Sequence, residues 1–280
     1  MKLAILADIH ANLPALQAVT DHLEAWRPDR VIVAGDVVNR GPRPAECLRF
    51  VQEKQRADGW LVVRGNHEEY VLTHAAPNAP RSGPHFELHR GSFWTYQQLR
   101  CDISGLEAMP LCLSLPAPDG GEVRATHASM LGTREGIDHR TPDDELERKL
   151  GSPAPRVLCV GHTHIPLVRS LNGTLVVNAG SVGLPFDRDT RAAYAQIEWQ
   201  HASWHAAIIR LDYDRAQAER DFYETGFIDG TALAQLVLIE LREARSQLYE
   251  WAKAYESRVL SGEMTMRESV REFVSASLRE

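Results

Sequence analysis

Short apolar runs recur along the first 180 residues, and each run leads into a cluster of glycine and polar side chains. Uninterrupted runs of this length are typical of strands buried on both faces of a sheet. Helical patterns lie between the first three runs, over 13–26 and from residue 45 onward. This alternation predicts an α/β fold with a mainly parallel sheet flanked by helices. The runs are 3–7, 31–34, 60–63, 123–126, 157–160 and 175–177.

Three later segments complete the expected organisation. Residues 192–213 predict a β-hairpin that closes the first region, and we place a catalytic domain at 1–214. Residues 73–92, which hold several Pro, Gly and His, predict a long irregular loop of the kind that covers active sites. Residues 215–280 are expected to form a C-terminal helical extension.

The segment 231–261 contains no Gly or Pro, and its apolar residues alternate at spacings of three and four. This seam predicts one continuous helix, on the order of 45 Å long, with about three heptads. Two interpretations remain open. The helix packs on its own domain, or it forms a homodimer contact or an arm over the active site.

Charge and apolar patterning exclude several protein classes. With 31 Lys and Arg against 38 Asp and Glu, the net charge of −7 disfavours binding to a nucleic-acid backbone. No apolar run approaches the roughly 18 residues of a membrane span, and the first run is too short for a signal peptide. The four cysteines form no close pair. We therefore expect a cytoplasmic protein without membrane partners, disulfides or a zinc ribbon.

Metal-binding side chains follow five of the predicted strands. In open α/β sheets, ligands bind beyond the carboxyl ends of the strands, so these segments are expected to share one site. Two Asp, one Asn and four His form a mixed nitrogen and oxygen set, which suits Mn, Fe, Co, Ni or Zn rather than Ca or Mg. Seven donors exceed one tetrahedral ion and suit two ions with a bridging carboxylate, an arrangement used for phosphoryl displacement. The segments are Asp8-Ile9-His10, Gly35-Asp36, Gly65-Asn66-His67-Glu68, Thr126-His127 and Gly161-His162-Thr163-His164.

In this order and spacing, the segments resemble the calcineurin-like metallophosphoesterase superfamily over nearly all of residues 1–180. The run Asn178-Ala179-Gly180-Ser181 is similar to a segment of its small bacterial and archaeal phosphodiesterase branch. The resemblance implies an α/β fold of four layers, an α/β/β/α sandwich with two mixed sheets.

The resemblance also implies roles for individual residues. Two divalent ions, with manganese favoured, would share Asp36 and activate a water for in-line attack on phosphorus. His67 would face the substrate as general acid or charge stabiliser. The first ion would be held by Asp8, His10, Asp36 and His164, and the second by Asp36, Asn66, His127 and His162.

Two further features are similar to the Ser/Thr protein phosphatases and the symmetrical dinucleoside tetraphosphatases. They are the segments 35–42 and 64–68, and the first places Arg40 four residues after Asp36, where an arginine would grip phosphate oxygens. His139, His85, His89 and Arg81 are further candidates for substrate contacts.

We therefore expect a hydrolase of a small phosphodiester, phosphomonoester or nucleotide. The alternatives are a phosphoprotein phosphatase or dinucleoside polyphosphate hydrolase and, from another class, a metal-bound protein-interaction scaffold.

Overall fold

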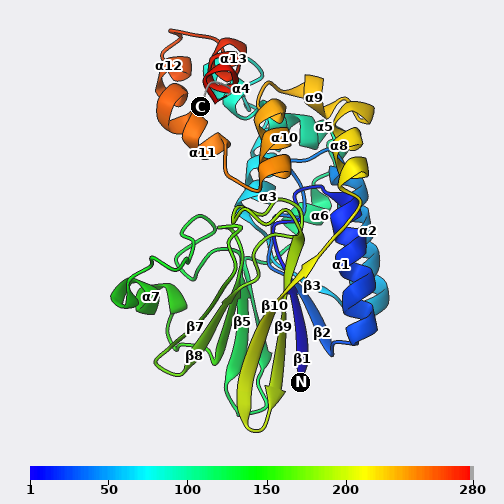
Figure 1. The fold of residues 1–280 in the computed structure, drawn as a ribbon, viewed down its shortest axis with the longest axis vertical. Coiled ribbons are helices and arrows are strands. Elements are labelled where there is room, and N and C mark those ends of the chain that lie inside the picture. The colour runs from blue at the N-terminus through cyan, green and yellow to red at the C-terminus, as the bar shows by residue number, and fades with distance from the viewer. Residues whose placement is uncertain (278–280) are drawn as a thin grey trace.

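Two five-stranded sheets lie face to face, and helices cover their outer faces (Figure 1). The structure is a computed structural model that describes residues 1–277. The first sheet has the order β10-β9-β1-β2-β3 and the second β4-β5-β6-β8-β7. The first sheet contains β1 Lys2–Leu6, β2 Arg30–Val33, β3 Leu61–Val62, β9 Ala192–Gln200 and β10 Ser203–Leu211. The second contains β4 Cys112–Pro116, β5 Glu122–Thr126, β6 Val157–Val160, β7 Leu167–Leu171 and β8 Thr174–Asn178.

Each sheet combines three parallel strands with antiparallel ones, which lie at both edges of the second sheet and at the β10 edge of the first. Strands β1, β2 and β3 are parallel, as are β5, β6 and β8. The predicted hairpin forms as β9 and β10, which add two antiparallel strands to the first sheet. The sheets are therefore mixed, which confirms the predicted fold class.

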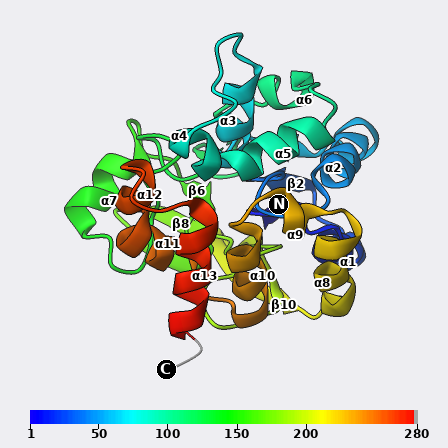
Figure 2. The same ribbon diagram turned by 90° about the horizontal axis from the view of Figure 1, so that it is seen from above.

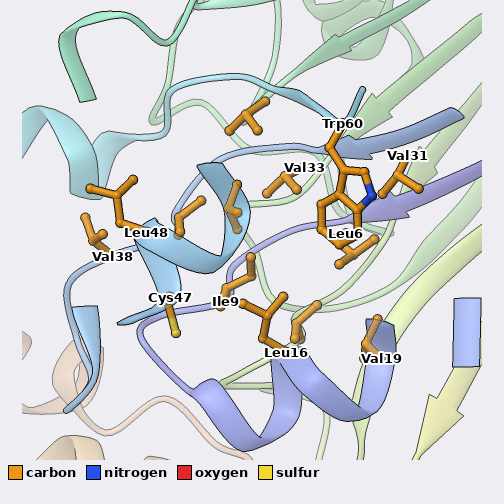
Figure 3. Packing of buried hydrophobic residues seen from close by; sticks show 14 of the residues in the cluster. Leu6, Ile9, Leu16, Val19, Val31, Val33, Val38, Cys47, Leu48 and Trp60 are labelled. Atoms are coloured by element: carbon orange, nitrogen blue, oxygen red, sulfur yellow. The ribbon is translucent and has the colours of Figure 1, made fainter. Parts of the chain in front are cut away.

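Alternation along β1 separates two cores. Leu3 and Ile5 point into the space between the sheets, whereas Ala4 and Leu6 face the helices α1 (Leu13–Trp26) and α2 (Pro44–Asp58). Figure 3 shows Leu16 and Val19 of α1 and Cys47 and Leu48 of α2 in the same cluster as Leu6. On the far side, α7 (Asp143–Leu150) covers the second sheet through Leu146 and Leu150. These clusters form the four expected layers.

The segment 73–92 differs from the irregular loop that the sequence predicts. It contains a 3-10 turn at Thr73–Ala75, the helix α4 (Pro84–Leu88) and the start of α5 (Arg90–Gln98). Phe86 packs edge-on against Phe93 with ring centroids 5.2 Å apart, and His74 contacts the Ser92 hydroxyl at 2.9 Å. These contacts order a segment whose Pro and Gly content favours a loop. Helix α3 (Asn66–Leu72) precedes this segment, and α6 (Ser104–Glu107) follows α5 along the chain.

The prediction of one continuous helix over 231–261 is wrong. Helix α10 (Ala234–Glu243) ends at Ala244, where φ is +49°. The buried carboxylate of Glu240 then accepts hydrogen bonds from the backbone N–H groups of Gln247 and Leu248, at 2.8 and 2.9 Å. Those bonds stabilise a turn inside the predicted helix. The remaining elements are α8 Arg215–Glu224, α9 Phe227–Gly230, α11 Leu248–Trp251, a π turn at Ala252–Glu256, α12 Ser257–Leu260 and α13 Met266–Ser277.

The apolar residues of the predicted seam are buried largely within this chain. Ala234, Val237 and Leu241 pack with Phe227 and Trp94. Figures 1 and 2 show α10, α11 and α13 lying over the end of the sheets toward which β1 and β2 run. The domain boundary at 214 and a homodimer through 231–261 stay predictions. Within residues 1–277, no helix is long and apolar enough to cross a membrane.

Candidate metal centre and substrate cavity

The structure brings all seven predicted metal ligands together at the carboxyl ends of the strands. Ligand atoms of Asp8, His10 and His164 lie within 4.8 Å of one another, as do those of Asp8, Asp36 and His127. The Asn66 side-chain oxygen lies 2.8 Å from His127 Nε2 and 3.0 Å from His162 Nδ1. The five loops that carry these residues therefore lie around one site, as the sequence predicts.

Glycines in the predicted motifs let the backbone approach the two carboxylates closely. A Cβ atom on Gly65 would lie 2.1 Å from Asp36 Oδ1, and one on Gly161 would lie 2.5 Å from Asp8 Oδ2. The N–H groups of His67 and His162 donate to these same oxygens at 2.9 and 2.8 Å. Each carboxylate is thus held in place by the loop that carries another ligand.

Backbone carbonyls orient three of the histidine rings. The Nδ1 atoms of His10, His127 and His164 lie 3.2, 2.8 and 2.5 Å from the carbonyl oxygens of Asn39, Ala34 and Leu184. A carbonyl only accepts, so Nδ1 carries a hydrogen in each ring, and in the neutral form of the ring Nε2 turns its lone pair toward the centre.

Two features of the cluster fit a bound cation. The Nε2 atoms of His10 and His164 lie 3.1 Å apart, although both carry lone pairs in this tautomer. Asp8 Oδ1 is buried without a hydrogen-bond partner among residues 1–277 and lies 3.4 Å from His164 Nε2. A divalent ion would satisfy all three atoms.

Burial sets the protonation of the histidines. Desolvation lowers the pKa values of His10 and His164 well below the ordinary range, which keeps them in the neutral form that binds metal. Burial also lowers the pKa of His127, but the Asp36 carboxylate, 3.3 Å away, outweighs it and raises the pKa to about 10. A cation beside Asp36 would compete with that proton.

Glu68 is a structural member of the site whose role the sequence did not reveal. Its fully buried carboxylate accepts four backbone N–H groups, from Gly65 at 2.8 Å, Asp36 at 2.9 Å, Val37 at 2.8 Å and Val38 at 3.1 Å. It therefore ties the start of α3 to the loop after β2. The available signal was its position three residues after Gly65, where a glutamate reaches back to the start of a helix.

Asn178 and Ser181, from the predicted Asn-x-Gly-Ser run, hold the loops around the site. The amide of Asn178 donates to the Gly161 carbonyl at 2.8 Å and contacts the Thr163 hydroxyl at 2.9 Å. The Ser181 hydroxyl donates to the Asp8 carbonyl at 2.7 Å. These two side chains therefore position the loops that carry the predicted metal ligands, by holding the backbone of those loops.

The ring of His67 is fixed as a hydrogen-bond donor. The Asn39 amide nitrogen lies 2.8 Å from His67 Nδ1, and the Asn39 oxygen accepts from Thr95 Oγ1 at 3.4 Å. An amide N–H donates, so Nδ1 accepts and Nε2 carries the hydrogen. Burial lowers the pKa of His67 to about 3, with Asp36 opposing and Arg40 adding to the shift. The neutral ring thus offers one N–H.

Arg40 lies beside the metal centre with a partner from the C-terminal helices. One guanidinium nitrogen donates to Glu240 Oε2 at 2.6 Å, and the group lies 5.3 Å from the centre of the Phe186 ring. Glu240 is fully buried in α10. The sequence reasoning missed it because 200 positions separate the two residues.

A cavity of about 410 Å³ joins the metal centre to the C-terminal helices. Asp36, Asn66, His67, His162 and His164 line one end, and His89, a predicted candidate, lines the wall. The other candidates lie apart. Arg81, His85 and His139 are exposed and are not among the described residues that line this cavity, and Arg81 donates instead to the His74 carbonyl at 2.7 Å.

Comparison with known proteins extends the sequence resemblance. Residues 1–201 match the family model of the calcineurin-like phosphoesterase superfamily domain. The chain is 27% identical to the phosphodiesterase YfcE of Escherichia coli K12 over 66% of this chain and 81% of that protein. It is 36% identical to a symmetrical bis(5'-nucleosyl)-tetraphosphatase of Psychromonas ingrahamii over 24% of each chain. A metallophosphoesterase structure from Sphaerobacter thermophilus aligns with a TM-score of 0.67 at 25% identity, covering 87% of this chain and all of that one.

Proposed function

Since the chain belongs to the calcineurin-like phosphoesterase superfamily and is a hydrolase, we propose that it cleaves a small phosphate ester with two transition-metal ions, manganese favoured. The observation that carries this proposal is the cluster of seven buried or half-buried donors. Within it, a carboxylate oxygen and two facing imidazole nitrogens lack any other suitable partner.

The donor set divides between two ions. Asp8, His10 and His164 would hold the first, and Asn66, His127 and His162 the second, with Asp36 shared. When bound, such ions supply positive charge beside the phosphate and lower the pKa of a coordinated water. Neutral imidazoles and ionised carboxylates are the required ligand forms.

His67 and Arg40 handle the substrate in this proposal. His67 offers its Nε2–H to an ester oxygen, and that hydrogen bond stabilises the charge that develops as the P–O bond breaks. Arg40 lines the cavity with 15% of its side chain exposed, so the part of the guanidinium that faces the cavity can donate to a phosphate oxygen while one nitrogen stays on Glu240.

The relatives support two ester classes. One is named a phosphodiesterase, and another a symmetrical bis(5'-nucleosyl)-tetraphosphatase. A dinucleoside polyphosphate is therefore a second candidate substrate. A phosphoprotein is disfavoured because the C-terminal helices line the cavity opposite the metal centre. The complete donor set disfavours a scaffold without catalysis.

The test combines metal analysis with hydrolysis. We would strip the protein with a chelator, reload it with manganese, and assay a diester, a monoester, a dinucleoside tetraphosphate and a phosphopeptide. Asp36→Asn should lose at least one bound ion per chain and nearly all turnover. Asp144→Asn, with a side chain 80% exposed, is the matched control. Full activity in the stripped protein, or unchanged metal content in Asp36→Asn, would refute the proposal.

A further inference from the structure

The cavity has a second end that the metal centre does not use. Phe227, Val237, Leu248 and Trp251 line it, and all four come from the helices beyond residue 201, outside the region that matches the family model. We propose that this apolar end is a subsite for the organic group of the substrate and selects esters of nucleoside size that carry a heteroaromatic ring. This inference rests on the proposed function and names the substrate class for the same site.

The walls of the subsite suit a flat ring. Trp251 is held in orientation because its indole N–H donates to Ser269 Oγ of α13 at 3.1 Å. Tyr70 also lines the cavity, and its ring centre is 5.3 Å from that of His67 and 5.6 Å from that of His89. Aromatic side chains in the wall of a cavity favour a ligand with its own π system.

A buried hydroxyl in the cavity wall favours a ligand with a polar atom as well. Thr231 is 4% exposed and lines the cavity, and its Oγ1 has no hydrogen-bond partner among residues 1–277. Buried hydroxyls in proteins are normally paired, so an unpaired hydroxyl on a residue that lines the cavity favours a ligand that carries a donor or acceptor near it. A heteroaromatic ring combines an apolar face with such atoms at its edge.

The size of the cavity limits the substrate. About 410 Å³ lies at the lower end of the range for sites that enclose a small organic ligand. That space accommodates a phosphate and one nucleoside-sized group, whereas a folded phosphoprotein would have to displace the C-terminal helices.

One carboxylate connects the two ends of the cavity. Glu240 holds Arg40 through Oε2 and accepts the N–H groups of Gln247 and Leu248, at the start of α11, through Oε1. Because α11 carries Leu248 and Trp251, the arginine beside the phosphate and the apolar wall are positioned by the same side chain. The C-terminal helices are therefore part of the site.

The first experiment compares two ligands that differ only at C1 of the sugar, where one carries a heteroaromatic base and the other a methoxy group. Adenosine 5'-monophosphate and methyl β-ribofuranoside 5-phosphate share the phosphate and the sugar, and both would be assayed as monoesters and as methyl diesters. We expect the base to raise kcat/KM, and affinity measured by calorimetry on the manganese-loaded protein, by roughly 10- to 100-fold. Equal values for the two ligands would overturn the inference, as would a phosphoserine peptide that is hydrolysed equally well.

The second experiment fills part of the subsite with a larger side chain. Ala252→Phe places a ring on a residue that lines the cavity, and Ala254→Phe makes the same change at an exposed position of the same turn. The preference for the base-bearing ligand should fall at least fivefold in Ala252→Phe and stay within twofold in Ala254→Phe. Equal effects of the two changes would contradict the proposed subsite. If Ala252→Phe does not fold, the comparison of the two sugar phosphates on the unmodified protein still tests the subsite.

The two proposals fail in different ways. If both sugar phosphates are hydrolysed equally and bind equally, the phosphoesterase function stands and the ring subsite falls. If the base-bearing ligand binds preferentially but no ester is hydrolysed, the subsite stands and the proposed function falls. If neither ligand binds, the subsite is refuted.

Discussion

The substitution Glu68→Gln tests whether the loops of the metal centre are held by a single buried carboxylate. In the protein as it stands, Oε1 accepts from Val37 and Val38, and Oε2 accepts from Gly65 and Asp36. A glutamine has only one acceptor oxygen. Whichever way the amide is turned, its NH₂ group faces two backbone N–H groups that also donate.

The magnitude follows from those two lost acceptors. A buried N–H group left without a partner costs about 1–3 kcal/mol, so Glu68→Gln should lower the free energy of unfolding by about 2–6 kcal/mol. That is a large share of the roughly 5–15 kcal/mol that stabilises most proteins. It corresponds to a fall in Tm of roughly 3–10 °C for a chain of 280 residues.

The assay is thermal unfolding of chelator-treated protein at pH 8. Chelation removes any contribution from bound ions, and the pH lies above the pKa of Glu68, which burial and the nearby Asp36 charge raise to about 7. Glu69→Gln is the matched control on the same helix. Its side chain is 28% exposed and accepts from Thr133 Oγ1 at 2.9 Å, so a loss below about 1 kcal/mol is expected. Equal Tm values for the two variants would refute the reasoning.

Two further predictions concern side chains that position the catalytic groups. Asn39→Gly removes the amide that fixes the tautomer of His67 and adds no strain, because φ at Asn39 is +68°. kcat should fall roughly 10-fold at unchanged metal content, and steady-state kinetics with metal analysis checks this. Glu240→Gln weakens the pair with Arg40 and should cost about 1–3 kcal/mol in urea unfolding, whereas the exposed Glu243→Gln should cost little. When Glu240→Gln is added to the variant Arg40→Met, most of this loss of unfolding free energy should vanish. An undiminished loss there would contradict the conclusion that Glu240 acts through its pair with Arg40.

The sequence predicted the strands and the ligand cluster because each signal is local. An apolar run followed within a few residues by Gly and Asp or His marks both a strand and the atoms at its carboxyl end, as at 3–7 followed by Asp8 and His10. The fold then brings the strand ends together, so convergence follows from topology. Gly65 and Gly161 add a steric signal that is equally local.

The parts that the sequence did not predict depend on contacts between distant positions. The spacing of apolar residues over 231–261 is the same whether the helix continues or turns. The turn begins at Ala244, and no Gly or Pro stands there to mark the break. The turn depends on Glu240, which interacts forward with Gln247 and Leu248 and far backward with Arg40. Periodicity records which side of a helix is buried. It does not record what that side packs against.

His89 and His85 illustrate the same limit within one short segment. Both lie in the segment 73–92, and both are exposed. His85, inside α4, is not among the residues that line the cavity, whereas His89 at the end of that helix lines its wall beside Tyr70. The sequence makes both histidines candidates for substrate contacts. Only the geometry of α4 shows which of them lines the cavity.

The pair between Arg40 and Glu240 changes how the match to residues 1–201 should be understood. That match covers every predicted metal ligand, His67 and Arg40, and so contains the chemistry of phosphate ester cleavage. It does not contain the group that holds the arginine, nor Trp251 and Leu248, which line the cavity opposite the metal centre. A chain ending at residue 201 would leave Arg40 without its carboxylate partner and the cavity open to water. In the proposed subsite, selection between substrates belongs to the C-terminal helices, and proteins that share the metal centre but carry other C-terminal segments are expected to differ in substrate while retaining the same chemistry.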